Sequence, residues 1–442
     1  MPDKHELPYL HAMEVKHNSI LEKGKPTFFK KHQNALYKSL EDKHTTVEVE
    51  EDPLGTRMIL NMGPQHPATH GVLRLLLQLE GEKILRNRLD IGYLHRGVEK
   101  IAENKTYQEF MPYTDRMDYL SPYSNNVALC TAVEKIASIE VPERAQYIRM
   151  VGAELARISS HLLYLGAMVM DTGAISFFIW TFIQREKIYD IFDNFGGHRF
   201  TISHSRIGGV HNDLSPECIA MIEEFITEFP KKLVEWRKLL NKNRIFYDRN
   251  LNVGKISHEE AISIGMTGPN IRAVGVPYDI RKFSPYLKYD EVEFDVPTRL
   301  EGDNLARYFI RIEEMAESVK IIRQCLDKLP KGPIRTDNAK QAYPSKDEVY
   351  YSMEGMIHDF MMTDTGVCPP EGVESYHSVE APKGELGYHI QSDGTGHPWR
   401  LKINAPSFSN LQGLEKILDG EMIADTVVLI GGVDPVMGES DK

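Results

Sequence analysis

The densest group of residues suited to chemistry is the run Gly63–Gly71, which carries His66 and His70. The prolines and glycines of this run favour a loop, so the two histidines do not share a helix face. A loop that joins two strands can direct imidazoles into a cavity, where a pKa near neutrality suits proton donation. The alternative is a pair of turn histidines bonded to backbone. A metal site is less favoured, because no nearby cysteine or carboxylate completes a set of ligands.

A second cluster packs Arg116, Asp118 and Tyr119 into four positions just before the apolar segment 127–139. A tyrosine hydroxyl can donate a hydrogen bond to a carbonyl group, and a nearby guanidinium can stabilise developing negative charge. The alternative interpretation is an ion-paired helix start, and the cluster alone favours that alternative.

Asp171 is the third candidate, because it lies within the apolar stretch 162–183. The stretch is long enough for a membrane span, but a carboxylate near the middle of a bilayer would cost about 3 kcal/mol or more. We therefore expect two buried helices that meet at a turn after Asp171. A buried acid needs a partner, and a histidine would serve. The alternative is a helix C-terminal acid bonded to the amides of the following turn.

The elements that must position these groups follow from apolar periodicity. Short apolar runs predict strands at 57–62 and 72–79, with a turn at Gly81-Glu82 before Ile84. Residues 384–403 alternate in strand fashion, with Trp399, Leu401 and Ile403 on one face. Apolar spacing of three and four, with capping residues, predicts long helices in a block that begins at Pro142 and then at 174–195, 216–242 and 304–329.

We therefore predict an α+β fold, in which a central helical core is flanked by smaller β-containing regions at both ends. The predicted divisions are a polar extension, 1–54; an N-terminal β-rich region with the histidine loop, 55–115; a helical core, 116–340, with a loop-rich insertion, 265–297; and a C-terminal α/β region with a buried tail, 341–442.

Composition excludes several classes of protein. The 442 residues carry a formal charge of −12, which argues against nucleic acid as the main partner. Four scattered cysteines without a C-x-x-C pair exclude a disulfide framework and a cysteine-held zinc or iron–sulfur centre. The sequence lacks the G-x-G-x-x-G, Walker A, H-E-x-x-H and G-x-S-x-G motifs. We find no nicotinamide, flavin or cluster site in this chain, and no metal site.

Taken in order, these segments resemble the 49-kDa-type family (the D subunits) of respiratory complex I, the NADH:quinone oxidoreductase. The resemblance runs from about Met58 to the end of the chain and rests on independent motifs: Gly63–Gly71, Gly92–Lys100, Arg116–Leu120, Arg206–Val210, Ala381–Tyr388, Ala405–Phe408 and Asp434–Glu439. The same segments also resemble the large subunit of nickel–iron hydrogenases, which implies that the helical bundle is of that type.

The hydrogenase function can be tested on the sequence. Those enzymes hold nickel and iron with two pairs of cysteines, and here the matching positions carry other residues: Asp118, Ser121, Val436 and Glu439. All four soft ligands are missing, and valine cannot ligate a metal. Hydrogenase activity is therefore excluded.

The resemblance to the complex I family implies a quinone headgroup site in the cavity where hydrogenases hold their metal. His70 and Tyr119 would donate hydrogen bonds and protons to the two quinone carbonyls, and Asp171 would pair with His70. Arg116 would lie against the terminal 4Fe-4S cluster of the neighbouring B subunit. Other residues near the pocket or the cluster would be His66, Asp118, Val436 and Met437.

The same resemblance implies a peripheral-arm component of a proton-translocating enzyme, inactive alone. Its partners would be the B subunit, the C subunit, the membrane-embedded H subunit and other complex I subunits, with ubiquinone or menaquinone as substrate. FMN and further Fe–S clusters would lie elsewhere in the complex. The lack of a transit-type segment implies the cytoplasmic face of a bacterial inner membrane. Alternatives are an equivalent subunit fed by ferredoxin or a reduced deazaflavin, or a scaffold without a working site.

The sequence departs from the family pattern at two positions. Many relatives carry a histidine where this chain has Thr201, and the change predicts a cluster potential that is lower or less sensitive to pH; His198 or His204 could compensate. The final residue is Lys442 where relatives usually have arginine. Lysine keeps the charge but loses the bidentate fork, which puts a terminal anchoring contact in doubt.

Overall fold

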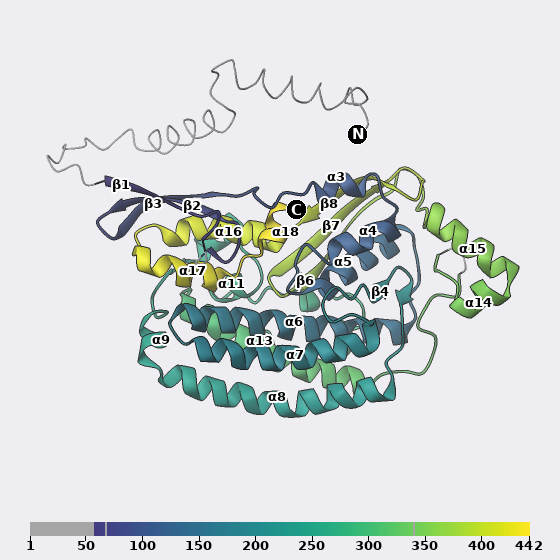
Figure 1. Ribbon diagram of the computed structural model, residues 1–442, viewed down its shortest axis with the longest axis horizontal. Helices are drawn as coiled ribbons and strands as arrows, with labels where there is room; N and C mark the ends of the chain where they lie inside the picture. The colour runs from purple at the N-terminus through teal and green to yellow at the C-terminus, as the bar shows by residue number, and fades with distance from the viewer. Residues whose placement is uncertain (1–56, 67–68, 339–340) are drawn as a thin grey trace, which may run out of the picture. The chain divides into compact units, whose positions relative to one another are not determined.

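The N-terminal sheet carries the histidine loop between its first two strands (Figure 1). The computed structural model describes residues 57–66, 69–338 and 341–442, so the predicted extension 1–54 lies outside the described residues. The sheet is antiparallel in the order β1-β2-β3: β1 (Arg57–Met62), β2 (Arg74–Glu80) and β3 (Lys83–Asp90). Leucines 75, 76, 77 and 79 of β2 are buried, so this strand is covered on both faces. The predicted strands and the turn at Gly81 are confirmed.

Long helices form the core: α5 (Pro122–Ile136), α6 (Glu143–Asp171), α7 (Ile175–Gly196), α8 (Pro216–Lys242) and α13 (Asn304–Asp327). The central helix α6 packs against α7 and α13. It ends at Asp171, and three residues separate it from α7, so the predicted turn between two helices is confirmed. The expectation that both helices are buried was wrong for α7, because Ile175, Ile179 and Ile183 along one of its faces are 51–66% exposed. Among the described residues, no helix is long and apolar enough to cross a membrane.

Two core helices begin at the capping residues that the sequence predicts. The Ser215 hydroxyl accepts a hydrogen bond from the Cys218 amide at the start of α8. The Asp303 carboxylate accepts one from the Ala306 amide at the start of α13. In both cases the side chain satisfies an amide that the helix leaves without a partner.

The C-terminal region contains a second antiparallel sheet, β6-β7-β8, which packs on α5. Its strands are β6 (Glu374–Ala381), β7 (Gly384–Ser392) and β8 (Pro398–Asn404). Leu401 and Ile403 are buried, but the prediction for Trp399 was wrong, because its side chain is 70% exposed. The pairing of β7 with β8 shifts between Gln391 and Ser392, which puts Pro398 rather than Trp399 on the buried face.

Three helices complete this region: α16 (Pro406–Leu418), α17 (Thr426–Val433) and α18 (Met437–Asp441). The other elements are short: α3 (Val98–Ala102), α4 (Tyr107–Thr114), β4 (Ser205–Arg206), β5 (Gly209–Val210), α9 (Arg244–Asp248), α10 (His258–Ile264), α11 (Pro269–Arg272), α12 (Ile280–Phe283), η2 (Tyr289–Glu291), α14 (Lys346–Tyr351), α15 (Met353–Asp364) and η3 (Ile423–Asp425). The mixed α+β class is confirmed. The three finer divisions within 55–442 stay predictions.

Candidate functional site

The first half of the site is an ion pair between the histidine loop and the end of α6. His70 Nε2 lies 2.8 Å from Asp171 Oδ2, and the two side chains are 19% and 10% exposed. The loop reaches the helix partly because His70 adopts a left-handed backbone conformation, with φ of 52°. Asp171, the last residue of α6, therefore contacts an imidazole that lies 101 positions earlier in the chain.

The surroundings of His70 favour its protonated form. Burial, the largest influence, lowers the pKa of the imidazole, but the hydrogen bond to Asp171 and the charges of Asp171 and Asp434 outweigh it. The pKa of His70 is thus raised above its ordinary value. The imidazole can hold a proton near neutral pH and give it to an acceptor.

Helix α17 packs against the His70–Asp171 pair at Gly431. A β-carbon at this position would lie 3.3 Å from Asp171 Oδ2 and 3.6 Å from His70 Cε1, so the absence of a side chain lets the helix approach closely. The next helix, α18, continues the wall: its Met437 is buried, and a β-carbon on Gly71 would lie 3.0 Å from Met437 Cγ. Val436, at the start of α18, is buried as well.

Tyr119 borders the same first turn of α18. A β-carbon on Gly438 would lie 3.2 Å from Tyr119 Cε1, so the ring packs against the helix backbone. The pKa of Tyr119 is raised by burial first and then by the charges of Asp118 and Asp434, while Arg96 opposes them. Gly71, which follows His70, and Tyr119 pack against consecutive residues of α18, Met437 and Gly438, so the two predicted proton donors approach the same turn of that helix.

A group of buried charges lies behind Tyr119. Asp118 and Glu439 are 1% and 0% exposed, and Asp118 Oδ2 and Glu439 Oε1 are buried without a hydrogen bond among the described residues. Burial and the charge of Asp118 raise the pKa of Glu439 to about 8, against the opposing effects of Ser407 and Lys383. The ammonium of Lys383 pairs with Asp434. We call Asp118, Lys383, Asp434 and Glu439 the site cluster.

The sequence analysis identified only part of the site cluster as functional. Asp118 was a candidate, whereas Glu439 and Lys383 were noted only within motifs. The available signal for Glu439 was the resemblance, which implies that it stands where hydrogenases have a metal-binding cysteine. Nothing in the periodicity pointed to Lys383, because its partners come from α6 and the α17–α18 turn: its ammonium donates to Ser160 Oγ at 2.9 Å.

The remaining predicted site residues lie at the surface. Arg116 is exposed and donates to the carbonyl of Pro112 at 2.5 Å, and its own carbonyl accepts a hydrogen bond from Arg96 at 2.8 Å. His66 is exposed in the histidine loop, and its carbonyl accepts from the amide and hydroxyl of Thr69. Their proposed contacts with a cluster or a quinone stay predictions.

The two departures from the family pattern have structural consequences. Lys442 is anchored: its ammonium donates to the Ile403 carbonyl at 2.6 Å, and its carbonyl accepts from the Arg96 amide at 3.3 Å. The doubt about this contact was wrong, because a lysine reaches a carbonyl without needing a bidentate fork. His204 is enclosed between Tyr123 and the Asn212 carbonyl, and burial lowers its pKa to about 3. Compensation for Thr201 by His198 or His204 stays a prediction.

No group of three or more histidine, cysteine, aspartate or glutamate side chains suited to a metal ion occurs in the described part of the chain. The groups that the structure brings together here can hold protons: an imidazole paired with a carboxylate, a phenol and a carboxyl with a raised pKa.

Comparisons with known proteins identify the family to which the chain belongs. Residues 171–442 match the family described as respiratory-chain NADH dehydrogenase, 49 Kd subunit. The chain is 63% identical to the D subunit of NADH-quinone oxidoreductase from Salinibacter ruber, over 94% of this chain and 96% of that protein. It is 62% identical to the first D subunit of Chloroherpeton thalassium, over 92% of each chain, and 51% identical to the D subunit of Methylacidiphilum infernorum, over 88% and 93%. The chain thus belongs to the 49-kDa family, the D subunits of the NADH-quinone oxidoreductase complex.

Proposed function

We propose that this chain forms the site at which the quinone headgroup is reduced, and that His70 and Tyr119 are its proton donors. The observation that carries the proposal is the His70–Asp171 pair, whose Nε2 and Oδ2 atoms lie 2.8 Å apart, beside the turn of α18 against which Tyr119 also packs. Val436 and Met437 would form the apolar wall of the pocket, and Asp118 would lie behind it.

Reduction of a quinone to a quinol takes up two electrons and two protons, one proton on each carbonyl oxygen. His70 would give one proton from its imidazolium, and Tyr119 would give the other from its hydroxyl. Asp171 holds the imidazole in one orientation and stabilises its protonated form, as a carboxylate does for a catalytic histidine. The electrons would come from a 4Fe-4S cluster on the B subunit, which Arg116 would face, and FMN and further clusters would lie elsewhere in the complex.

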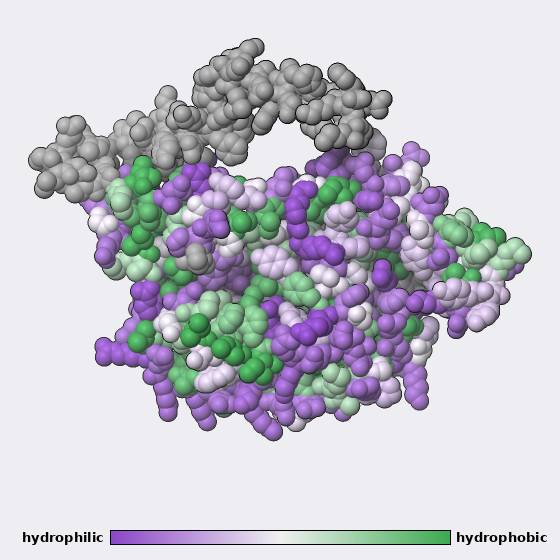
Figure 2. All heavy atoms as spheres, viewed as in Figure 1, coloured by the Kyte–Doolittle hydropathy of each residue, from purple (hydrophilic) through white to green (hydrophobic). Residues whose placement is uncertain are grey.

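The partners in this proposal are the B and C subunits and the membrane-embedded H subunit of a proton-translocating complex at the cytoplasmic face of a bacterial inner membrane. An exposed apolar stripe on α7 supports a protein contact beside the site, because it begins four residues after Asp171. Its members are Ile175, Ile179 and Ile183, which are 66%, 58% and 51% exposed, and Figure 2 shows a hydrophobic area over this helix. The same proposal includes a structural similarity between this helical core and the helical core of the nickel–iron hydrogenase large subunit.

The test is the variant His70→Ala in the assembled complex. We expect quinone reductase activity to fall at least about 100-fold, since a positioned proton donor contributes on that scale. NADH:ferricyanide activity should stay unchanged, because it reports electron input and bypasses the quinone end. Tyr119→Phe should give the same pattern while it preserves the ring.

A control with the same chemical change is His389→Ala, which removes a partly exposed imidazole on β7 whose nearest acid is Glu374 at 3.7 Å. Both activities should survive this change. If His70→Ala and Tyr119→Phe also left both activities intact, the chain would be a scaffold at these positions and the proposal would be wrong.

A further inference from the structure

Helix α17 contacts the proposed proton donor on one face and the core helix α13 on another, through two consecutive glycines. Gly431 packs against the His70–Asp171 pair, as described above. At the next residue, Gly432, a β-carbon would overlap Asn304 Oδ1 at the start of α13. A residue without a side chain is therefore required there. The position of α17 against the pair thus depends on how α13 holds this helix.

The C-terminal end of α17 is buried and needs hydrogen-bond donors from other parts of the chain. Gly432 and Val433 are both buried, and the last carbonyls of a helix have no amide partner within that helix. Arg311 of α13 donates to the carbonyl of Gly432 at 2.9 Å and to that of Val433 at 3.3 Å. Asn270 of α11 also donates to the carbonyl of Val433, at 3.2 Å. Side chains from two other helices therefore hold the end of α17.

Arg311 is itself fixed in place. It is 1% exposed, and its guanidinium carbon lies 4.0 Å from the centre of the Tyr164 ring on α6. A planar guanidinium can stack on an aromatic ring while it donates hydrogen bonds along its edge, which an ammonium cannot do. Its positive charge is also favourable beside the negative end of the α17 dipole. Arg311 therefore connects the central helix α6 to the end of α17.

The support for α17 comes from one face of α13. Asn304, Arg307 and Arg311 are separated by three and four positions, which places them on the same side of the helix. Asn304 Nδ2 donates to the carbonyl of Val428 within α17 at 3.0 Å and to Asn250 Oδ1 at 2.7 Å, so its amide is held against the helix. Apolar spacing located α13 but did not reveal this polar face.

The end of α17 also determines the position of Asp434, the residue that follows it. Asp434 has a left-handed backbone conformation, with φ of 59°, and its carboxylate pairs with Lys383. A shift of the helix end would therefore change two features of the site. It would alter the contact of Gly431 with the His70–Asp171 pair, and it would alter the ion pair of Asp434.

We propose that Arg311 is a positioning residue for the quinone site: by holding the last carbonyls of α17, it fixes this helix against the His70–Asp171 pair. The inference rests on the proposed function and adds to it a residue that takes no part in proton transfer. A residue that served the fold alone would affect stability without acting selectively on quinone reduction.

The experiment compares Arg311→Met with Arg311→Lys in the assembled complex. Methionine fills similar space but donates no hydrogen bond, and we expect quinone reductase activity to fall at least about tenfold, because small displacements of reacting groups are costly. Lysine keeps the charge and can reach one carbonyl, so Arg311→Lys should recover part of the activity. NADH:ferricyanide activity should stay unchanged in both variants. Full quinone reductase activity in Arg311→Met, or an equal loss of both activities, would overturn the proposal.

Arg307 provides a control that is matched in burial. It is 0% exposed, lies on the same face of α13, and donates to the carbonyls of Gly254 and Gly302, outside α17, at 3.0 and 3.3 Å. Arg307→Met should lower the thermal unfolding midpoint as Arg311→Met does, but it should leave quinone reductase activity unchanged in the complex that assembles. An equal loss of that activity in both variants would show a general effect of losing a buried arginine and would contradict a specific role for Arg311.

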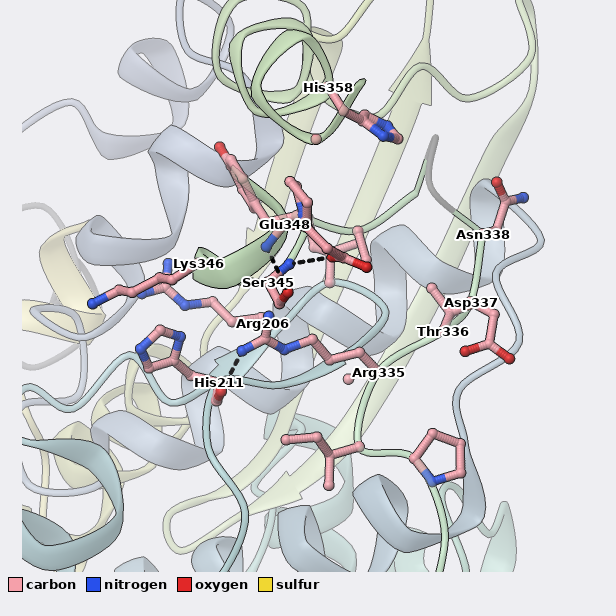
Figure 3. A pocket seen from close by; sticks show the side chains of 18 of the residues that line it. Arg206, His211, Arg335, Thr336, Asp337, Asn338, Ser345, Lys346, Glu348 and His358 are labelled. Carbon is pink, nitrogen blue, oxygen red and sulfur yellow. Dashed lines mark hydrogen bonds between the residues drawn. The ribbon is translucent and has the colours of Figure 1, made fainter. Parts of the chain in front are cut away.

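Arg335 provides a second control, matched in its acceptors. It lies in an open cleft between the β4–β5 hairpin and α14, and no residue of the proposed site lines this cleft (Figure 3). Like Arg311, it donates to two consecutive carbonyls, those of Val210 and His211, at 3.3 and 2.5 Å. Arg335→Met removes the same charge and should leave both activities unchanged. A loss as large as that of Arg311→Met would assign the effect to net charge and would contradict the proposal.

The connection between Arg311 and the pair can be measured with a second change in α17. Gly431→Ala adds a methyl group 3.3 Å from Asp171 Oδ2, so it disturbs the same contact from within the helix. If Arg311 acts through that contact, the double variant Gly431→Ala/Arg311→Met should lose less activity than the product of the two single losses. Losses that multiply would show that the two residues act independently, and they would overturn the proposal.

The variant His70→Ala separates this inference from the proposed function. If His70→Ala abolishes quinone reduction while Arg311→Met leaves it intact, the role assigned to Arg311 is wrong and the proposed function stands. If neither variant affects quinone reduction, the proposed function is wrong, and the inference fails with it.

Discussion

Two buried groups of charged residues in this protein each make contacts with side chains of helix α6, and they differ in their numbers of acids and bases. The first, which we call the ionic core, lies between α6, α13 and β6 and consists of Glu154, Arg157, Arg272, Asp279, Arg281, Glu314 and Glu380. The second is the site cluster behind Tyr119. The ionic core contains three arginines and four acids, whereas the site cluster contains one lysine and three acids.

This balance determines the direction of the pKa shifts. In the ionic core burial raises the pKa of Asp279, but Arg281 and Arg272 outweigh it and lower the value to about 2. The surplus acid of that group, Glu380, has a raised pKa, caused by burial and the charge of Asp279. In the site cluster the pKa of Glu439 rises to about 8. A buried acid that lacks its own base holds a proton instead.

The largest expected effect is the loss of a base from the ionic core. Arg281→Ala removes the partner of Asp279 at 2.7 Å and of Glu154 at 3.1 Å, and both acids are almost fully buried. Leaving buried charges without their partner costs about 3–5 kcal/mol. We expect a large fall in the thermal unfolding midpoint or a failure to assemble, measured by differential scanning fluorimetry and by recovery of the complex.

The control is a similar change at the surface. Arg400 pairs with Glu103 at 2.8 Å, but its side chain is 44% exposed. Arg400→Ala should cost less than about 1 kcal/mol, because water and salt screen such pairs. If the two variants lost equal stability, the contrast between buried and exposed pairs would not apply here.

A smaller effect is expected from Asp171→Asn, which keeps the shape of the site but removes a charge. The pKa of His70 should then fall, since Asp171 opposes the effect of burial. Only the protonated imidazole can give a proton, so quinone reductase activity should be lost at a lower pH than in the unmodified complex. The measurement is the pH profile of quinone reductase activity beside that of NADH:ferricyanide activity.

Two other outcomes of the Asp171→Asn experiment would each point to a different role for the pair. A uniform loss at every pH would indicate that the carboxylate only orients the loop. An unchanged profile would show that His70 does not supply the proton, and it would contradict the proposed function even if the fold were intact.

The sequence predicted local structure better than contacts between distant segments. Apolar spacing and capping residues located the core helices and the N-terminal strands, because those signals act within a few residues. The His70–Asp171 contact joins residues 101 positions apart, and only the resemblance to a family pointed to it. The burial of Glu439 beside Asp118 depends on how α18 packs against residues 116–119, which periodicity does not encode. Trp399 was mispredicted for a related reason, an irregular strand pairing.

At acidic pH, the smallest expected effect concerns the carboxyl of Glu439, which holds a proton. Glu439 has a pKa of about 8 in the folded protein against an ordinary value of 4.5, so the folded state binds this proton more tightly than the unfolded state. Stability from this group is therefore lost as pH rises between about 4.5 and about 8, and it changes no further above that range. Glu439→Gln imitates the protonated form and removes this dependence. At acidic pH we expect a change of less than about 1 kcal/mol, because the amide replaces a neutral carboxyl of similar size.

The readout is the difference in unfolding midpoint between Glu439→Gln and the unmodified complex as a function of pH. The difference should grow in favour of the glutamine variant as pH rises, whereas parallel curves would show that Glu439 titrates normally. Glu314, in the ionic core, gives the opposite sign: burial raises its pKa, but Arg272 and His161 lower it further. Stability from Glu314 is therefore lost as pH falls. Opposite slopes at these two glutamates would show that the number of neighbouring bases, rather than burial alone, decides which acid keeps its proton.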